Sequence, residues 1–173
     1  VFMKKIFLLS LCCLASLLIA NAQKFALIDM EYIMENIPEF QQANEKLNVA
    51  SQQYQKAIEA KVKEAETLYT AYQKASSSLT AAQRTQKEEA IVAKEREAAD
   101  LRKKYFGPEG EMAQKEEALI APIQNRIYEA VKQISIQKGY DAVIDRASAT
   151  SIIFASPRID ISNEVLSKLG YSN

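Results

Sequence analysis

The sequence has 173 residues, 48% of them hydrophobic, with 22 basic and 22 acidic side chains. This balance of charge argues against a dedicated nucleic-acid-binding protein, which presents a strongly basic surface. Histidine is absent from the whole sequence, so histidine-based acid–base catalysis and zinc sites built with histidine are excluded.

The first 22 residues predict a cleaved signal peptide. Lys4 and Lys5 precede an apolar run at residues 6–20, and the sequence Ala-Asn-Ala that ends at Ala22 is typical of a signal-peptidase site. A membrane anchor is the alternative, and it is less favoured because the run is shorter than the ~20 residues of a membrane-spanning helix. Cleavage after Ala22 leaves 151 residues with 20 basic and 22 acidic side chains, a net charge of −2.

Both cysteines, Cys12 and Cys13, lie inside the predicted signal peptide. Lipidation is disfavoured, because Leu11 stands where a lipoprotein signal needs a small residue. The mature chain therefore has no disulfide, no cysteine nucleophile and no cysteine-based zinc site.

Residues 24–30 (KFALIDM) predict a β-strand. Phe25, Leu27 and Ile28 put large apolar side chains on both faces of the pleat, so this strand requires burial on both sides. Helical spacing follows at Ile33 and beyond, and Pro38 interrupts it, which predicts a short helix, a break and then a long helix.

The long helix continues in a heptad-like stripe that drifts along its length. The residues of this stripe are Ala43, Leu47, Ala50, Tyr54 and Ala57, then Ile58, Val62, Ala65, Tyr69 and Tyr72. Residues 76–83 (SSSLTAAQ) end it, and Thr80 with Gln83 fits a capping box. The first helix is thus expected to end near Ala75 and the next to begin near Ala81.

The returning helix shows a seven-residue repeat followed by tighter spacing. Its apolar positions are Ile91, Ala98, Tyr105, Met112 and Leu119, then Ile123, Ile127, Ala130 and Ile134. Residues 107–110 (GPEG) must break or bend it, because proline removes a helical hydrogen bond and glycine weakens the helix. Two interpretations stay open: a surface loop between helices, or a hinge in a long arm formed by Gly107, Pro108 and Gly110.

Two further strands and a final helix are predicted near the C-terminus. Gly139 ends the helical region, residues 140–145 (YDAVID) form the second strand, and residues 150–155 (TSIIFA) form the third after a short turn. Asp160 caps a last helix that runs to about Leu169.

The predicted fold class is α+β, mainly α: a long antiparallel helical hairpin on a small β body. Residues 23–40 and 139–173 form the body. Residues 41–138 form the hairpin arm, with its tip near 76–84 and its break at 107–110. An antiparallel hairpin returns its two ends to one place, so the three strands meet at its base.

Three short strands and one helix bury too little apolar surface to be stable alone. We therefore expect an obligate homo-oligomer in which other copies complete the β body. The candidate residues of its core are Phe25, Leu27, Ile28, Val143, Ile144, Ile152, Ile153 and Phe154.

With these elements, the chain resembles the Skp/OmpH family of periplasmic chaperones. The matches are strongest at residues 25–30, 127–132, 140–145 and 160–166. The order strand, hairpin, strand and the terminal helix that begins Asp-Ile-Ser carry the resemblance.

The resemblance implies a jellyfish-shaped homotrimer whose strands are shared among three chains. Three helical arms surround a cavity that holds unfolded outer-membrane proteins in the periplasm without ATP. It implies no cofactor, no catalytic or metal-binding residue and no nucleic-acid partner, with transient contact to a membrane surface. Glu88 with Glu89, and Glu116 with Glu117, are adjacent in sequence and diverge on a helix, so they form no catalytic carboxylate pair.

The arms depart from the strongly basic best-known members of the family. Residues 41–117 hold 13 basic and 13 acidic side chains, so no lipopolysaccharide site is carried over. The basic run at residues 102–104 is interpreted as a solvated helix face. A structural coiled-coil scaffold of the envelope, without unfolded clients, is the alternative function.

Only fifteen side chains are large and apolar in residues 41–118. Tyrosine can contact both apolar and polar parts of a client, so the candidate client contacts are Tyr54, Tyr69, Tyr72 and Tyr105. The alternative is that these tyrosines fill the seam between the two helices.

Overall fold

The computed structural model describes residues 23–171 of the chain. The predicted signal peptide, its cleavage after Ala22 and the two cysteines lie outside the described residues. The described residues divide into two compact units, one of residues 23–33 with 129–171 and one of residues 34–128. We call them the sheet unit and the hairpin unit and describe each by itself.

The sheet unit is built on two parallel strands. Strand β1 (Phe25–Ile28) pairs with β2 (Ala142–Asp145), in the register that places Phe25 opposite Ala142. The other edge of β1 is also occupied, because the Ile161 N–H donates to the Leu27 carbonyl at 2.9 Å. Two segments from the C-terminal part of the chain therefore flank β1, one at each edge.

The third strand predicted at residues 150–155 is wrong, because these residues form turns and irregular backbone. Ile153 is 101% exposed and Phe154 is 85% exposed. A strand added beside β2 would stand at the outer edge of a very small sheet, with nothing in the described chain to cover its apolar side chains. Strand propensity alone is not sufficient there.

Two short helices belong to the start and the end of the chain. Helix α2 (Met30–Glu35) begins one residue after β1, and α6 (Ser162–Leu169) comes after a 3-10 turn, η3 (Pro157–Ile159). Gly170 ends α6 at a positive φ of 89°, a backbone conformation that glycine adopts readily. The burial of Val165 and Leu166 shows that α6 contributes to the core of the sheet unit.

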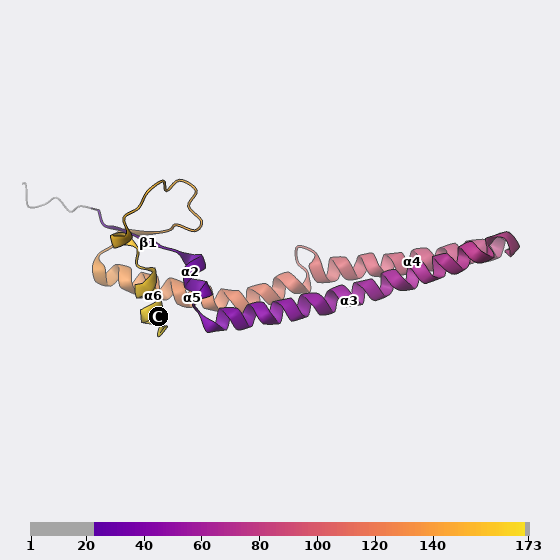
Figure 1. The fold of residues 1–173 in the computed structure, drawn as a ribbon, viewed down its shortest axis with the longest axis horizontal. Helices are drawn as coiled ribbons and strands as arrows, with labels where there is room; N and C mark the ends of the chain where they lie inside the picture. The colour runs from indigo at the N-terminus through magenta and orange to yellow at the C-terminus, as the bar shows by residue number, and fades with distance from the viewer. Residues whose placement is uncertain (1–22, 172–173) are drawn as a thin grey trace, which may run out of the picture. The chain divides into compact units, whose positions relative to one another are not determined.

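Helix α3 (Pro38–Ala75) forms one side of the hairpin, and α4 (Ala81–Phe106) forms the other (Figure 1). Pro38 is the first residue of α3, where its missing N–H costs nothing. A 3-10 turn, η2 (Ser76–Ser78), connects the helices, and the predicted capping box of Thr80 and Gln83 is present. The break after α4 is also present, and α5 (Glu111–Lys138) follows it.

The seam between α3 and α4 is narrow and rich in alanine. Ile58 and Ala65 are buried on α3, and Ile91 and Ala98 are buried on α4. The buried Ala43 and Ala50 lie in the part of α3 that runs beside α5. Val62 and Tyr69, which the sequence placed on the stripe, are 37% and 50% exposed. The 3.6-residue period of the helix turns Val62 and Tyr69 away from the neighbouring helix. Few large side chains therefore hold α3 and α4 together.

A closed ring of polar contacts joins four residues of the sheet unit. Arg146 Nε and Nη2 each lie 3.0 Å from Asp29 Oδ2, and Arg146 Nη1 lies 3.5 Å from Asp160 Oδ2. Asp160 Oδ1 accepts the backbone N–H of Ser162 at 2.9 Å and its hydroxyl at 2.6 Å. The Ser162 hydroxyl oxygen in turn accepts the Asp29 N–H at 2.9 Å.

The polar ring reaches the start of the last helix. The N-cap is Ile161, which has no side-chain cap bond, so the prediction of Asp160 as the cap is wrong by one residue. Asp160 still accepts the N–H of Ser162, the first residue of α6, and the Ser162 hydroxyl connects α6 to the end of β1.

Replacing Ser162 by alanine should destabilise the sheet unit. Ser162 is 3% exposed, and its loss leaves the Asp29 N–H without its acceptor, which costs about 1–3 kcal/mol. Urea unfolding at a fixed protomer concentration measures the change in the free energy of unfolding. The control is Ser167→Ala, at an exposed position on the same helix. Equal free energies of unfolding for the two variants would contradict a stabilising role of the polar ring.

Replacing Asp145 by asparagine should lower stability at neutral pH and matter less in acid. Burial alone would raise the pKa of Asp145, but hydrogen bonds from the Met30 N–H, the Ser148 hydroxyl and the backbone after β2 outweigh it and hold the pKa below its ordinary value. A lowered pKa contributes stability above the unfolded pKa of about 4, and this contribution is lost as the pH falls through the folded value.

We therefore expect Asp145→Asn to cost about 1 kcal/mol at pH 7, because bonds to a charged acceptor become bonds to a neutral one. The difference in the free energy of unfolding between wild type and Asp145→Asn, measured by urea unfolding at several pH values, should decrease steadily below about pH 4. A difference that stays constant down to pH 2 would show that the carboxylate charge contributes nothing to stability.

Candidate functional site

The break between α4 and α5 is a tight, hydrogen-bonded turn. The Gly107 N–H donates to Lys103 and the Gly110 N–H donates to Gly107, each at 2.9 Å, and the Gln114 N–H donates to Gly110 at 3.1 Å. Figure 1 shows the turn leaving the line of the two helices. The backbone of the break is therefore ordered, and its interpretation as a hinge stays a prediction.

Both glycines of the break are required for space rather than for an unusual φ. A Cβ at Gly107 would lie 2.3 Å from the Lys103 carbonyl oxygen, and a Cβ at Gly110 would lie 2.8 Å from the Tyr105 carbonyl oxygen. These contacts are to backbone, which cannot rotate away as a side chain can. The turn is thus closed to any larger residue at either position.

Five side chains from three helices meet beside the turn, and we call them the break cluster. Tyr54 of α3 stacks on Tyr105 of α4 with ring centroids 4.1 Å apart, and Phe106 meets Tyr54 edge-on at 6.3 Å. Lys104 lies 3.2 Å from Glu111 across the turn and 5.4 Å from the Tyr105 ring centroid.

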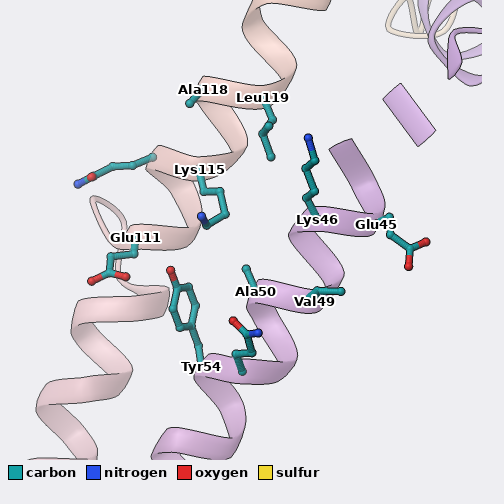
Figure 2. A pocket seen from close by; sticks show the side chains of 11 residues that line it. Glu45, Lys46, Val49, Ala50, Tyr54, Glu111, Lys115, Ala118 and Leu119 are labelled. Atoms are coloured by element: carbon teal, nitrogen blue, oxygen red, sulfur yellow. The ribbon is translucent and has the colours of Figure 1, made fainter. Parts of the chain in front are cut away.

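Glu111 connects the ring stack to the first turn of α5. The Tyr54 hydroxyl donates to the Glu111 carboxylate (Figure 2), and this bond raises the pKa of Tyr54. The same bond, followed by the one from Lys104, lowers the pKa of Glu111. The carboxylate is therefore held ionised while it links α3, α4 and α5.

A cavity of about 700 Å³ lies next to the break cluster. Figure 2 shows α3 on one side of it and the start of α5 on the other. Its apolar lining comes from Val49, Ala50, Ala118 and Leu119, and its polar lining includes Tyr54, Glu111, Lys46 and Lys115. This volume is in the range of pockets that hold small ligands or a few side chains.

The four tyrosines predicted as client contacts have different surroundings. Tyr54 and Tyr105 are half-buried in the ring stack, and Tyr54 also lines the cavity. Tyr72 is half-buried and donates its hydroxyl to Glu88 of α4. Tyr69 is 50% exposed. The helix pair thus employs three of these rings in its own packing, and client contact stays a prediction for all four.

A network of two lysines and two glutamates joins α3 to α4, and the sequence analysis did not predict it. We call it the ion quartet. Lys61 and Lys94 each contact both Glu64 and Glu97, at 3.0 to 3.3 Å. The spacing of three residues within each Lys–Glu pair is visible in the sequence, but the pairing across helices depends on their register. These partly exposed bonds set register more than they add stability.

The predicted oligomer core is divided between buried and exposed residues. Leu27 and Ile28 are buried within the chain, whereas Val143 and Ile152 are half-buried. Ile136, which the sequence analysis did not single out, is 75% exposed in the same unit. The other exposed apolar residues are Phe25, Ile144, Ile153 and Phe154. Their place in an oligomer stays a prediction.

Residues 23–171 contain no group of three His, Cys, Asp or Glu side chains that could hold a metal ion. Among the described helices, none is both long and apolar enough to cross a membrane.

Three comparisons with known proteins agree with one another. A family model described as "Outer membrane protein (OmpH-like)" matches residues 24–169. The chaperone protein Skp of Yersinia enterocolitica is 27% identical over 149 residues, which cover 86% of this chain and 87% of that protein. A solved structure from Caulobacter crescentus, described as OmpH-like, shares the fold. Its TM-score is 0.67 at 12% identity, with 85% of this chain and 83% of that chain covered.

Replacing Gly110 by alanine should destabilise the hairpin unit by about 1–3 kcal/mol, the usual cost of forcing extra atoms into a packed site. The loss is measured by urea unfolding followed through helical circular dichroism. Glu109→Ala is the matched control, because it changes an exposed side chain of the same turn and should stay within about 0.5 kcal/mol of wild type. A wild-type midpoint for Gly110→Ala would show that the turn opens freely.

Proposed function

The chain belongs to the Skp/OmpH family, and from this premise we propose that it is an ATP-independent holdase chaperone of the periplasm. It binds unfolded outer-membrane proteins and keeps them from aggregating. The family match over residues 24–169 carries this proposal, since it includes both the sheet unit and the hairpin unit. Members of the family are chaperones rather than enzymes.

The proposed working form is a homotrimer that surrounds a client cavity with three arms. Support comes from the sheet unit, where Ile153 and Phe154 are almost fully exposed and Ile144 is 41% exposed. Apolar groups of this size gain from burial, at roughly 25 cal/mol per Å². A two-stranded sheet also needs further strands or helices for stability. Other copies of the chain supply both requirements.

The hairpin unit fits a holdase better than it fits a rigid scaffold. Its buried residues are small alanines interspersed with isoleucines, and its exposed apolar side chains are scattered along the helices, as at Val62, Val92 and Phe106. Scattered apolar groups give many weak contacts, so a client can be held and released by mass action. A continuous apolar face would bind too tightly and would promote self-association.

Native mass spectrometry of the mature protein should show a trimer that gains one client when a urea-unfolded outer-membrane barrel protein is diluted into it. Light scattering on the same mixture should show that the client stays soluble. A trimer that leaves the client to aggregate would favour the envelope scaffold. A stable monomer at nanomolar concentration would rule out the shared β body.

The double variant Ile153→Ser, Phe154→Ser should lose the trimer, because it removes the two most exposed large apolar side chains of the sheet unit. Mass spectra at several protein concentrations should show dissociation at concentrations at which the wild type stays assembled. The control is Val92→Ser, which removes an apolar side chain 59% exposed on the arm and should leave the trimer intact. Loss of the trimer in the control alone would place the interface on the arm.

A further inference from the structure

We propose that the cavity beside the break is a docking site for a short apolar stretch of an unfolded chain that carries an acidic residue at its flank. This inference rests on the proposed holdase function and specifies where on the arm, and through which chemistry, a client is held. It differs from general apolar contact because it predicts a preference for the sign of the client's charge.

The cavity exists because large and small side chains alternate along the seam. Two tyrosine rings, Tyr54 and Tyr105, fill the space between the helices at the break. The neighbouring lining includes the small side chains of Ala50 on α3 and Ala118 on α5. Helices with small contact residues approach closely when nothing prevents it. The ring stack, fixed through Glu111, acts as a spacer and leaves the adjacent seam unfilled.

The apolar lining gives the site its first requirement. Val49 is 45% exposed, and it lines the cavity together with Leu119. A client side chain placed there covers apolar surface that the hairpin unit leaves open to water.

The charges around the cavity give the second requirement. The Glu111 carboxylate already accepts from Tyr54 and contacts Lys104, and in Figure 2 the Glu45 side chain points away from α5. Lys46 and Lys115 line the cavity, and neither forms an ion pair with another described residue. Lys115 interacts with Glu111 only through a longer-range Coulombic attraction, which lowers the pKa of Glu111. The ammonium groups of Lys46 and Lys115 are therefore both available to a client carboxylate.

The test measures the binding of three fluorescent 12-residue peptides to the mature protein by anisotropy at low salt. One peptide is apolar with acidic flanks, the second has the same apolar centre with basic flanks, and the third is polar with acidic flanks. The first should bind tightest, by roughly three- to tenfold over the second, because two partly exposed charge pairs each contribute modestly. The third should bind weakest, because it lacks the apolar centre.

Reversing the two charges gives the decisive variant. Lys46→Glu with Lys115→Glu should invert the order of the first two peptides. Lys56→Glu with Lys87→Glu makes the same change of net charge at exposed arm positions away from the cavity and should preserve the order. An inverted order in both variants, or in neither, would overturn the proposal, since binding would then follow the overall field of the arm or no charge at all.

The apolar requirement has its own pair of variants. Val49→Ser should weaken both apolar peptides several-fold, whereas Val92→Ser, at a more exposed position outside the cavity, should not. Equal affinities for these two variants would also overturn the docking site. Native mass spectra of Lys46→Glu with Lys115→Glu should show the wild-type mass, and a change in subunit number would assign the cavity to contact between copies instead.

The holdase function is judged separately by the client-aggregation measurement on wild-type protein. A wild type that suppresses aggregation but binds all three peptides equally keeps the proposed function and loses the docking site. A wild type that fails to suppress aggregation loses the proposed function, and the peptide series still decides whether the cavity is selective.

Discussion

The contact on which the sheet unit depends is the bifurcated bond between Arg146 and Asp29. These residues are 117 positions apart in sequence, and they stand just after β2 and just after β1. Through Asp160, Arg146 also fixes the approach to α6. One guanidinium therefore coordinates the ends of both strands and the start of the last helix, which a flexible ammonium group cannot do with the same geometry. In a unit with only two strands, this polar ring supplies order that a thin apolar core does not.

The hairpin unit also buries few large apolar side chains, and it is stabilised in a different way. Its helices have strong intrinsic propensity and alanine-rich contacts, so they form locally and approach closely without a thick apolar seam. Specificity comes from a few discrete points, namely the capping box at Thr80, the ion quartet between α3 and α4, and the break cluster around Tyr54. Between these points the arm is held by few large buried side chains, which is compatible with a surface that adapts to many clients.

Signals in the sequence that act over a few residues predicted the structure well. The capping box, the proline at the start of α3 and the glycines at 107 and 110 specify local backbone, and the observed helices begin and end accordingly. Features that depend on partners far along the chain were not accessible in this way. The strand propensity of residues 150–155 says nothing of whether a neighbour is present. The ring stack of Tyr54 on Tyr105 and the cavity beside it follow from helix register, which alanine-rich spacing leaves ambiguous.

The parallel pairing of β1 with β2 also sets an order of events during folding. The two strands are separated by the entire hairpin, so closing them directly from an unfolded chain would require a very long loop. Helices α3 and α4 need only local contacts, and the ion pair of Glu39 with Arg126 at 3.2 Å joins the start of α3 to α5. We expect the helical hairpin to form first. Its formation shortens the effective loop between β1 and β2 to the few residues that connect each strand to the hairpin. Strand β1 would thus be among the last elements to find its place, and it would stay an unpaired apolar segment until residues 142–145 had formed β2.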